Sequence, residues 1–120
     1  MHARVYYQDF YKNISMVLKG VPNFEPDKAV HIGDFFTDAE TNEDRLCECE
    51  QIFARMNRLN VPVGHPDRDL FVKAGHTSMS VGDYIQFDDG QVWYCSRNAW
   101  LVRQASSSDW VKHTEIVEPV

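Results

Sequence analysis

The stretch of sequence that decides the fold is HTSMSVGDYIQFDDGQVWYCSRNAWLV, from His76 to Val102. Two β-rich runs, at 84–87 and 91–95, flank the turn sequence Asp88-Asp89-Gly90, a pattern typical of a β-hairpin. The turn before the first run ends in Asp83, and we expect this carboxylate to fix the turn by accepting backbone hydrogen bonds. The stretch therefore predicts a hairpin preceded by an ordered turn.

Upstream of the hairpin, strand and helix patterns alternate. The runs at 4–7 and 29–36 are β-rich, and Gly33 is expected to mark either a bulge or a close backbone approach in the second of them. Apolar residues at helical spacing predict a short helix over 10–20 and a longer one over 42–59.

The longer helix is the strongest local signal outside the hairpin. Thr41 or Asn42 can cap its N-terminus, and acidic residues in its first turn suit the helix dipole. Its apolar stripe comprises Leu46, Cys49, Ile52, Phe53, Met56 and Leu59. One face of this helix is therefore expected to pack on a sheet.

Downstream of the hairpin, a short strand is expected at 99–102. The sequence Ser106-Ser107-Ser108-Asp109 is expected to cap a short helical turn that holds Trp110 and Val111. We expect a mobile tail over about 112–120. The chain is thus predicted to form one α+β domain over 1–120, in the order β-α-β-α-β-β with a C-terminal hairpin. A small antiparallel sheet would pack on one main amphipathic helix.

Composition places the chain among ordinary globular proteins. It has 120 residues, of which 43% are hydrophobic and 25% charged, enough for one domain with a real core. No apolar run approaches the roughly 18 residues of a membrane helix, and residues 1–5 do not resemble a signal peptide. Three cysteines are an odd number, which is not typical of a secreted disulfide framework. We therefore expect a cytoplasmic protein with reduced thiols.

The negative charge is concentrated in one window. Residues 34–50 hold seven acidic side chains against Arg45 alone, an excess equal to the net charge of −6 of the whole chain. An acidic balance argues against direct binding to nucleic acid, which needs clustered Lys and Arg. A local acidic surface can instead attract a basic surface of another protein.

No pattern in the sequence predicts an active site, a metal site or a cofactor. Cys47 and Cys49 lie two positions apart on the predicted helix, so their side chains point about 200° apart and cannot share one ion. Cys95 is expected to be a small buried hydrophobe rather than a nucleophile. A small enzyme would instead require a pocket that brings Cys95 together with His31 and His76.

The acidic window is the one constellation that predicts a functional surface. It can be a solvated helix face and loop, or an interface whose carboxylates stand in for the phosphates of a nucleic acid. The candidate partner-binding residues are Asp38, Glu40, Glu43, Asp44, Glu48 and Glu50. Aromatic residues form a second candidate surface, together with the edge of the hairpin: Tyr6, Tyr7, Phe10, Tyr11, Trp93, Trp100 and Trp110.

Residues 77–83 and the hairpin that follows them resemble a recurrent C-terminal motif. The motif is the Ser-(Leu/Met)-Ser-Val-Gly-Asp hairpin of small accessory proteins encoded by phages, plasmids and other mobile elements. It is carried here by Thr77-Ser78-Met79-Ser80-Val81-Gly82-Asp83 with Asp89-Gly90, Trp93-Tyr94-Cys95 and Trp100. Val5-Tyr6-Tyr7 and Phe53-Ala54-Arg55-Met56-Asn57 resemble the rest of that pattern, whereas residues 60–75 and those after Ala105 do not.

The resemblance implies a mobile-element protein and carries no catalytic residues. Small acidic proteins of that setting are often inhibitors of host defence, of the anti-CRISPR or anti-restriction type. The expected function is therefore that of a non-enzymatic inhibitor, whose acidic surface blocks a host complex that handles nucleic acid. The alternative is a structural or regulatory accessory protein that binds a partner through its sheet edge and its aromatic residues.

Overall fold

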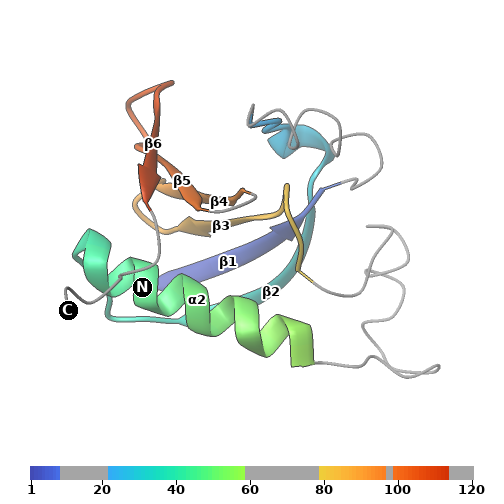
Figure 1. Cartoon of the computed structure of the whole chain (residues 1–120), viewed down its shortest axis with the longest axis vertical. Helices are drawn as coiled ribbons and strands as arrows, with labels where there is room; N and C mark the ends of the chain where they lie inside the picture. The colour runs from blue at the N-terminus through green and yellow to red at the C-terminus, as the bar shows by residue number, and fades with distance from the viewer. Residues whose placement is uncertain (9–21, 59–78, 97–98, 114–120) are drawn as a thin grey trace.

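The structure, a computed structural model, describes residues 1–8, 22–58, 79–96 and 99–113 (Figure 1). Its elements follow in the order β1 (His2–Tyr7), the 3-10 helix η1 (Pro26–Lys28), β2 (Val30–Phe36), α2 (Asn42–Arg58), β3 (Tyr84–Phe87), β4 (Val92–Cys95), β5 (Trp100–Arg103) and β6 (Trp110–His113). The fold is α+β, as predicted. The helix expected over 10–20 lies outside the described residues.

The strands form one antiparallel sheet in the order β2-β1-β3-β4-β5-β6. Both strands of the predicted hairpin, β3 and β4, are therefore paired on both sides. The expectation that a partner docks on the edge of the hairpin is wrong for this reason, because its backbone groups are used within the sheet. The edge strands of the described sheet are β2 and β6.

The pairing of β1 with β2 contains the bulge predicted at Gly33. Val5 lies opposite Gly33, whereas Tyr6 lies opposite His31, so Ile32 is an extra residue in β2. Such an insertion bends the strand and locally disrupts the ladder of hydrogen bonds.

The hairpin forms as the sequence predicts. The N–H of Phe87 donates to the carbonyl of Gln91 at 2.9 Å, and Gly90 has a φ of +88°, which suits glycine in a three-residue hairpin loop. The buried carboxylate of Asp83 accepts backbone N–H hydrogen bonds from Ser80 at 2.7 Å and from Gln8 at 2.8 Å. The predicted role of Asp83 in the preceding turn is confirmed.

Helix α2 begins and packs as its pattern predicts. The side-chain oxygen of Thr41 accepts a hydrogen bond from the backbone N–H of Asp44 at 3.1 Å, which caps the helix. The buried members of its apolar stripe join one core cluster with side chains from β1, β3, β4 and β5: Leu46, Cys49, Ile52 and Met56. Phe53 is half-buried against this cluster, and Leu59 lies outside the described residues.

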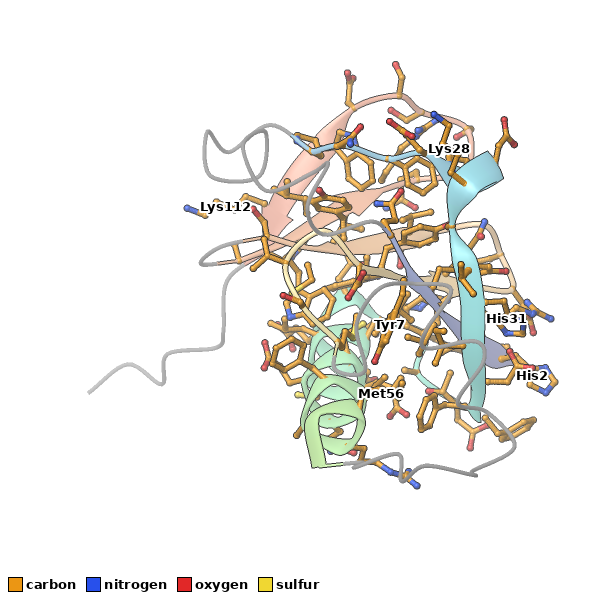
Figure 2. All side chains as sticks on the ribbon, turned by 90° about the vertical axis from the view of Figure 1, so that its right-hand side faces the viewer. His2, Tyr7, Lys28, His31, Met56 and Lys112 are labelled. Carbon is orange, nitrogen blue, oxygen red and sulfur yellow. The ribbon has the colours of Figure 1, made fainter. Side chains whose placement is uncertain are left out.

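The opposite face of the sheet carries a second, largely aromatic cluster. Tyr84, Val92 and Tyr94 form its buried centre, and Phe24 and Trp110 pack against them. Phe24 comes from the segment that leads to η1, which lies across the sheet from α2 (Figures 1 and 2). The sheet therefore separates two different environments.

The C-terminal region differs from its prediction. Trp110 and Val111 belong to strand β6 and not to a helical turn, because they pair with Arg103 and Val102 of β5. The expectation of a mobile tail is also wrong for Lys112 and His113, which continue the same strand. Residues 114–120 lie outside the described residues, and no helix among the described residues could span a membrane.

Candidate functional site

The acidic residues after β2 form the candidate site. They lie in the loop that leads from β2 into α2 and on the first turns of α2. Asp38, Glu40, Glu43 and Asp44 are exposed, and Glu48 is half-buried. We call these five residues the acidic surface.

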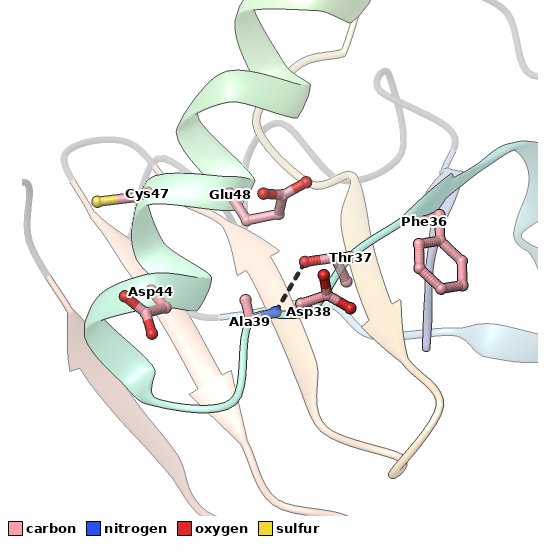
Figure 3. Close-up of a pocket in the computed structure, with 7 residues that line it drawn as sticks. All are labelled: Phe36, Thr37, Asp38, Ala39, Asp44, Cys47 and Glu48. Atoms are coloured by element: carbon pink, nitrogen blue, oxygen red, sulfur yellow. Dashed lines mark hydrogen bonds between the residues drawn. The ribbon is translucent and has the colours of Figure 1, made fainter.

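Part of the acidic surface lines an open pocket of about 500 Å³ (Figure 3). Its lining consists of Phe36, Thr37, Asp38, Ala39, Asp44, Cys47 and Glu48. The structure thus brings Asp38 of the loop together with Asp44 and Glu48 of the helix. Glu40 and Glu43 belong to the same segment but do not line the pocket.

The loop that carries Asp38 and Glu40 is held by hydrogen bonds that Thr37 forms with Met1 and with Ala39. The N–H of Thr37 donates to the carbonyl of Met1 at 2.9 Å, and the Met1 amine donates to the carbonyl of Thr37 at 3.1 Å. The Thr37 hydroxyl accepts from the N–H of Ala39 at 3.1 Å (Figure 3). The loop is therefore ordered before any partner arrives, which lowers the entropy cost of binding.

Arg45, the single cation of residues 34–50, faces the interior. Its side chain is 5% exposed, and its guanidinium lies 4.5 Å from the ring centre of Phe87. It donates to the carbonyl of Ala39 at 3.1 Å and to the side-chain oxygen of Gln91 at 2.6 Å, and it pairs with Asp89 at 2.8 Å. The positive charge is therefore neutralised at the hairpin turn and not on the acidic surface.

Glu50 has a different role from the other candidate residues. It is half-buried, and its carboxylate accepts a hydrogen bond from the indole N–H of Trp100 at 2.8 Å. This bond joins α2 to β5. Glu50 is therefore used to hold the fold together, and we leave it out of the acidic surface.

Phe36 is a candidate residue that the sequence analysis missed. Its side chain is 72% exposed at the mouth of the pocket, next to the ring of His2 at 5.8 Å between centroids. The signal was present, because neighbouring residues of a strand face opposite sides of the sheet. Of the consecutive pair Phe35-Phe36, one ring had to point away from the core.

Cys47 and Cys49 lie in different environments, as the helix geometry predicts. Cys47 is exposed in the pocket, whereas Cys49 and Cys95 are buried. Burial raises the pKa of Cys95 to about 12, and burial together with nearby carboxylates raises the pKa of Cys49 well above its ordinary value. Both buried thiols therefore stay protonated near neutral pH and are poor nucleophiles.

Of the residues that would indicate an enzyme, His31 and Cys95 lie far apart in the described sheet. His31 is exposed on β2 and bonds Asp34 at 2.7 Å, whereas Cys95 is buried on β4, and strands β1 and β3 lie between them. His76 lies outside the described residues. Among the residues that the structure describes, no group of His, Cys, Asp and Glu could hold a metal ion.

Comparisons with known proteins return no match. No protein-family model matches the chain, and the comparisons with curated proteins and with solved structures found no match. The resemblance to mobile-element proteins therefore rests on the quoted residues alone.

Proposed function

We propose that the chain is a non-enzymatic inhibitor from a phage or another mobile element, which binds a host defence complex through its acidic surface. The partner would present a basic surface that normally holds nucleic acid. The observation that carries this proposal is the burial of Arg45. Because its charge pairs with Asp89, the exposed side chains of residues 37–48 carry acidic charge without a compensating cation.

The spacing of the carboxylates supports an interface over a merely solvated helix. Glu43 and Asp44 lie in the first turn, where the helix dipole by itself favours acids. Glu48 lies beyond that turn and repeats the charge of Asp44 four residues later. A like-charge pair at this spacing costs a helix roughly 0.2–0.5 kcal/mol, so folding does not explain it.

The pocket suits an arginine or lysine side chain of the partner. Three carboxylates, from Asp38, Asp44 and Glu48, surround it and can receive a cation. The exposed ring of Phe36 offers an aromatic face beside them. An anchor of this kind would fix the orientation of a complex that charge alone would leave loose.

The first test is capture of partners from nuclease-treated host lysate, with the wild type and with the variant Asp44→Lys/Glu48→Lys. We expect the variant to lose the captured partner, and excess DNA to displace it from the wild type. Capture should also weaken as salt rises, because exposed charges are screened. The matched control is Asp27→Lys/Asp109→Lys, which makes the same change of charge at exposed sites away from the surface.

The exposed thiol of Cys47 provides a second readout. Among the three cysteines it is the exposed one, so a maleimide should label it first. A partner seated in the pocket should slow this labelling. If the reversal variant retains its partner, or if the partner leaves Cys47 as reactive as before, docking through the acidic surface is refuted.

A second candidate function is binding through the edge strand β6. Val111 is 58% exposed on that strand, and the strand lies at one edge of the described sheet. An added strand from a partner could pair there. The variant Val111→Lys would then abolish capture, whereas Trp100→Ala would report on folding, because Trp100 is buried in the core.

A further inference from the structure

A smaller pocket, of about 270 Å³, lies on the face of the sheet opposite α2. It is lined by Phe24, Pro26, Gln86, Gly90, Val92, Arg103, Gln104 and Ala105. Register places Gln86, Val92 and Arg103 in one row across β3, β4 and β5, and these residues contribute to the lining from the sheet. The other lining residues come from the segment around η1, the hairpin turn and the end of β5. The acidic surface has no residue in this pocket.

Two loops meet closely at one end of this pocket. A side chain at Gly90 would place its Cβ 2.6 Å from the Cβ of Ala105, so only glycine fits there. The β3–β4 turn and the segment after β5 therefore touch. This contact fixes Gln104 and Ala105 relative to the strands and gives the pocket a defined end.

Arg103 is the one charged residue among those that line the pocket. Its Nε donates to the carbonyl of Ser107 at 2.7 Å. Its guanidinium carbon lies 5.4 Å from the ring centre of Phe24 and 5.9 Å from that of Trp110. These contacts orient the planar group without neutralising it.

Most of the hydrogen-bonding capacity of Arg103 is unused. A guanidinium has five N–H donors, and only the Nε donor has a partner in the part of the chain that the structure describes. No carboxylate of the described residues forms an ion pair with it. A half-buried cation that lacks an acidic partner, in a chain of net charge −6, points to an external anion.

We propose that this pocket binds a small organic monocarboxylate, which pairs with the two terminal nitrogens of Arg103. The guanidinium fork matches the two oxygens of a planar carboxylate, and one positive charge balances one negative charge. Phe24, Pro26 and Val92 offer apolar walls for the rest of the ligand, and Gln86 and Gln104 offer amide groups. The volume is slightly below the usual range for drug-sized ligands, so a ligand of about one amino acid in size fits.

The test is an NMR titration of the ¹⁵N-labelled chain with N-acetylvaline. We expect saturable shifts at the backbone amides of Gly90, Gln104 and Ala105 and at the Nε–H of Arg103. N-acetylvalinamide, which lacks the charge, should bind about tenfold more weakly or worse. Inorganic phosphate is the third probe. If phosphate binds the pocket more tightly than N-acetylvaline, the carboxylate assignment is overturned.

Two variants test the role of Arg103. Arg103→Gln should weaken binding of N-acetylvaline by roughly tenfold or more. Gln104→Glu keeps Arg103 but adds a carboxylate beside it, and this internal competitor should weaken binding several-fold even if the first variant folds poorly. Lys112→Gln, which removes a cation outside the pocket, is the matched control and should bind as the wild type does. Equal binding of acid and amide, or unchanged affinity in Gln104→Glu and in a folded Arg103→Gln, would refute the proposal.

Discussion

Two arginines lie on opposite faces of the same sheet, and they differ in how deeply each is buried and in how many partners each has. Arg45, on the face that α2 covers, is almost fully buried and donates to Ala39, Gln91 and Asp89. Arg103, on the aromatic face, is half-buried and donates to the Ser107 carbonyl. Both guanidinium groups lie over aromatic rings.

The difference follows from the cost of burying a charge. A guanidinium in the core must be paired and hydrogen-bonded, because an unpaired buried charge is strongly destabilising. A half-buried one keeps water at its open side and can leave donors unused. The first arrangement stabilises a fold, whereas the second leaves binding capacity available for a ligand.

The largest effect is expected from Arg45→Met. This variant removes the cation from Asp89 and leaves the side-chain oxygen of Gln91 with one donor fewer. We expect the free energy of unfolding to fall by about 3 kcal/mol, near the lower end for a broken buried pair because Asp89 is half exposed. Urea denaturation measures it. A loss below about 1 kcal/mol would contradict the view that Arg45 is a structural residue.

The next largest effect is expected at Gln91, which connects the helix to the hairpin. Its side-chain oxygen accepts from Arg45 at 2.6 Å and from the indole N–H of Trp93 at 2.8 Å. Gln91→Leu leaves both donors unpaired and should cost about 2 kcal/mol. Gln91→Glu is the matched control, since a carboxylate can accept both bonds, and it should cost much less in the same denaturation experiment.

The Arg45–Asp89 pair should also make stability depend on pH. Burial raises the pKa of Asp89, but the hydrogen bonds from Arg45 and from the Gln91 N–H outweigh it, so the net pKa lies below its ordinary value. The contribution of the pair is therefore complete above about pH 4 and is lost as the pH falls through the folded-state pKa.

The variant that checks this dependence is Asp89→Asn. Between pH 5 and pH 3 we expect the wild type to lose more stability than this variant, by less than about 1 kcal/mol because the carboxylate is half exposed. Thermal unfolding across that range measures the difference. If the stability of the two proteins changes equally with pH, the Arg45–Asp89 pair does not contribute to the pH dependence.

The smallest effect on stability is expected from Arg103→Met. Methionine keeps apolar contact with Phe24 and Trp110 and loses the bond to Ser107, so the cost should be about 0.5 kcal/mol. If the cost instead equals that of Arg45→Met, Arg103 is a structural residue, and the contrast between the two arginines fails.

The sequence predicted the elements whose signals are local. The turn at Asp88-Asp89-Gly90, the bulge beside Gly33 and the cap at Thr41 each depend on residues that lie next to one another, and each is present. The serine run before Trp110 also gave a local signal, and it was misleading. Trp110 pairs with Arg103 on β5 and forms a strand instead of a helical turn, because the hydrogen bonds of the β5–β6 pairing stabilise more residues than one helix cap does.

The candidate site shows the same limit. The acidic residues were recognised from the distribution of charge along the sequence. In that count Arg45 only reduced the negative charge of residues 34–50 by one, and the direction of its side chain could not be predicted. Its inward orientation depends on Asp89 and Gln91, more than forty positions away along the chain. The hydrogen bond between Glu50 and Trp100 could not be predicted for the same reason, because the two residues lie fifty positions apart.

The bulge at Ile32 has a consequence for how copies of the chain behave at high concentration. β2 is an edge strand, and a straight edge strand can serve as a template on which other chains add to form fibrils. The extra residue shifts the outward N–H and C=O groups of β2 out of a regular repeat. A second chain cannot then pair along the whole strand, and we expect this edge to resist fibril growth.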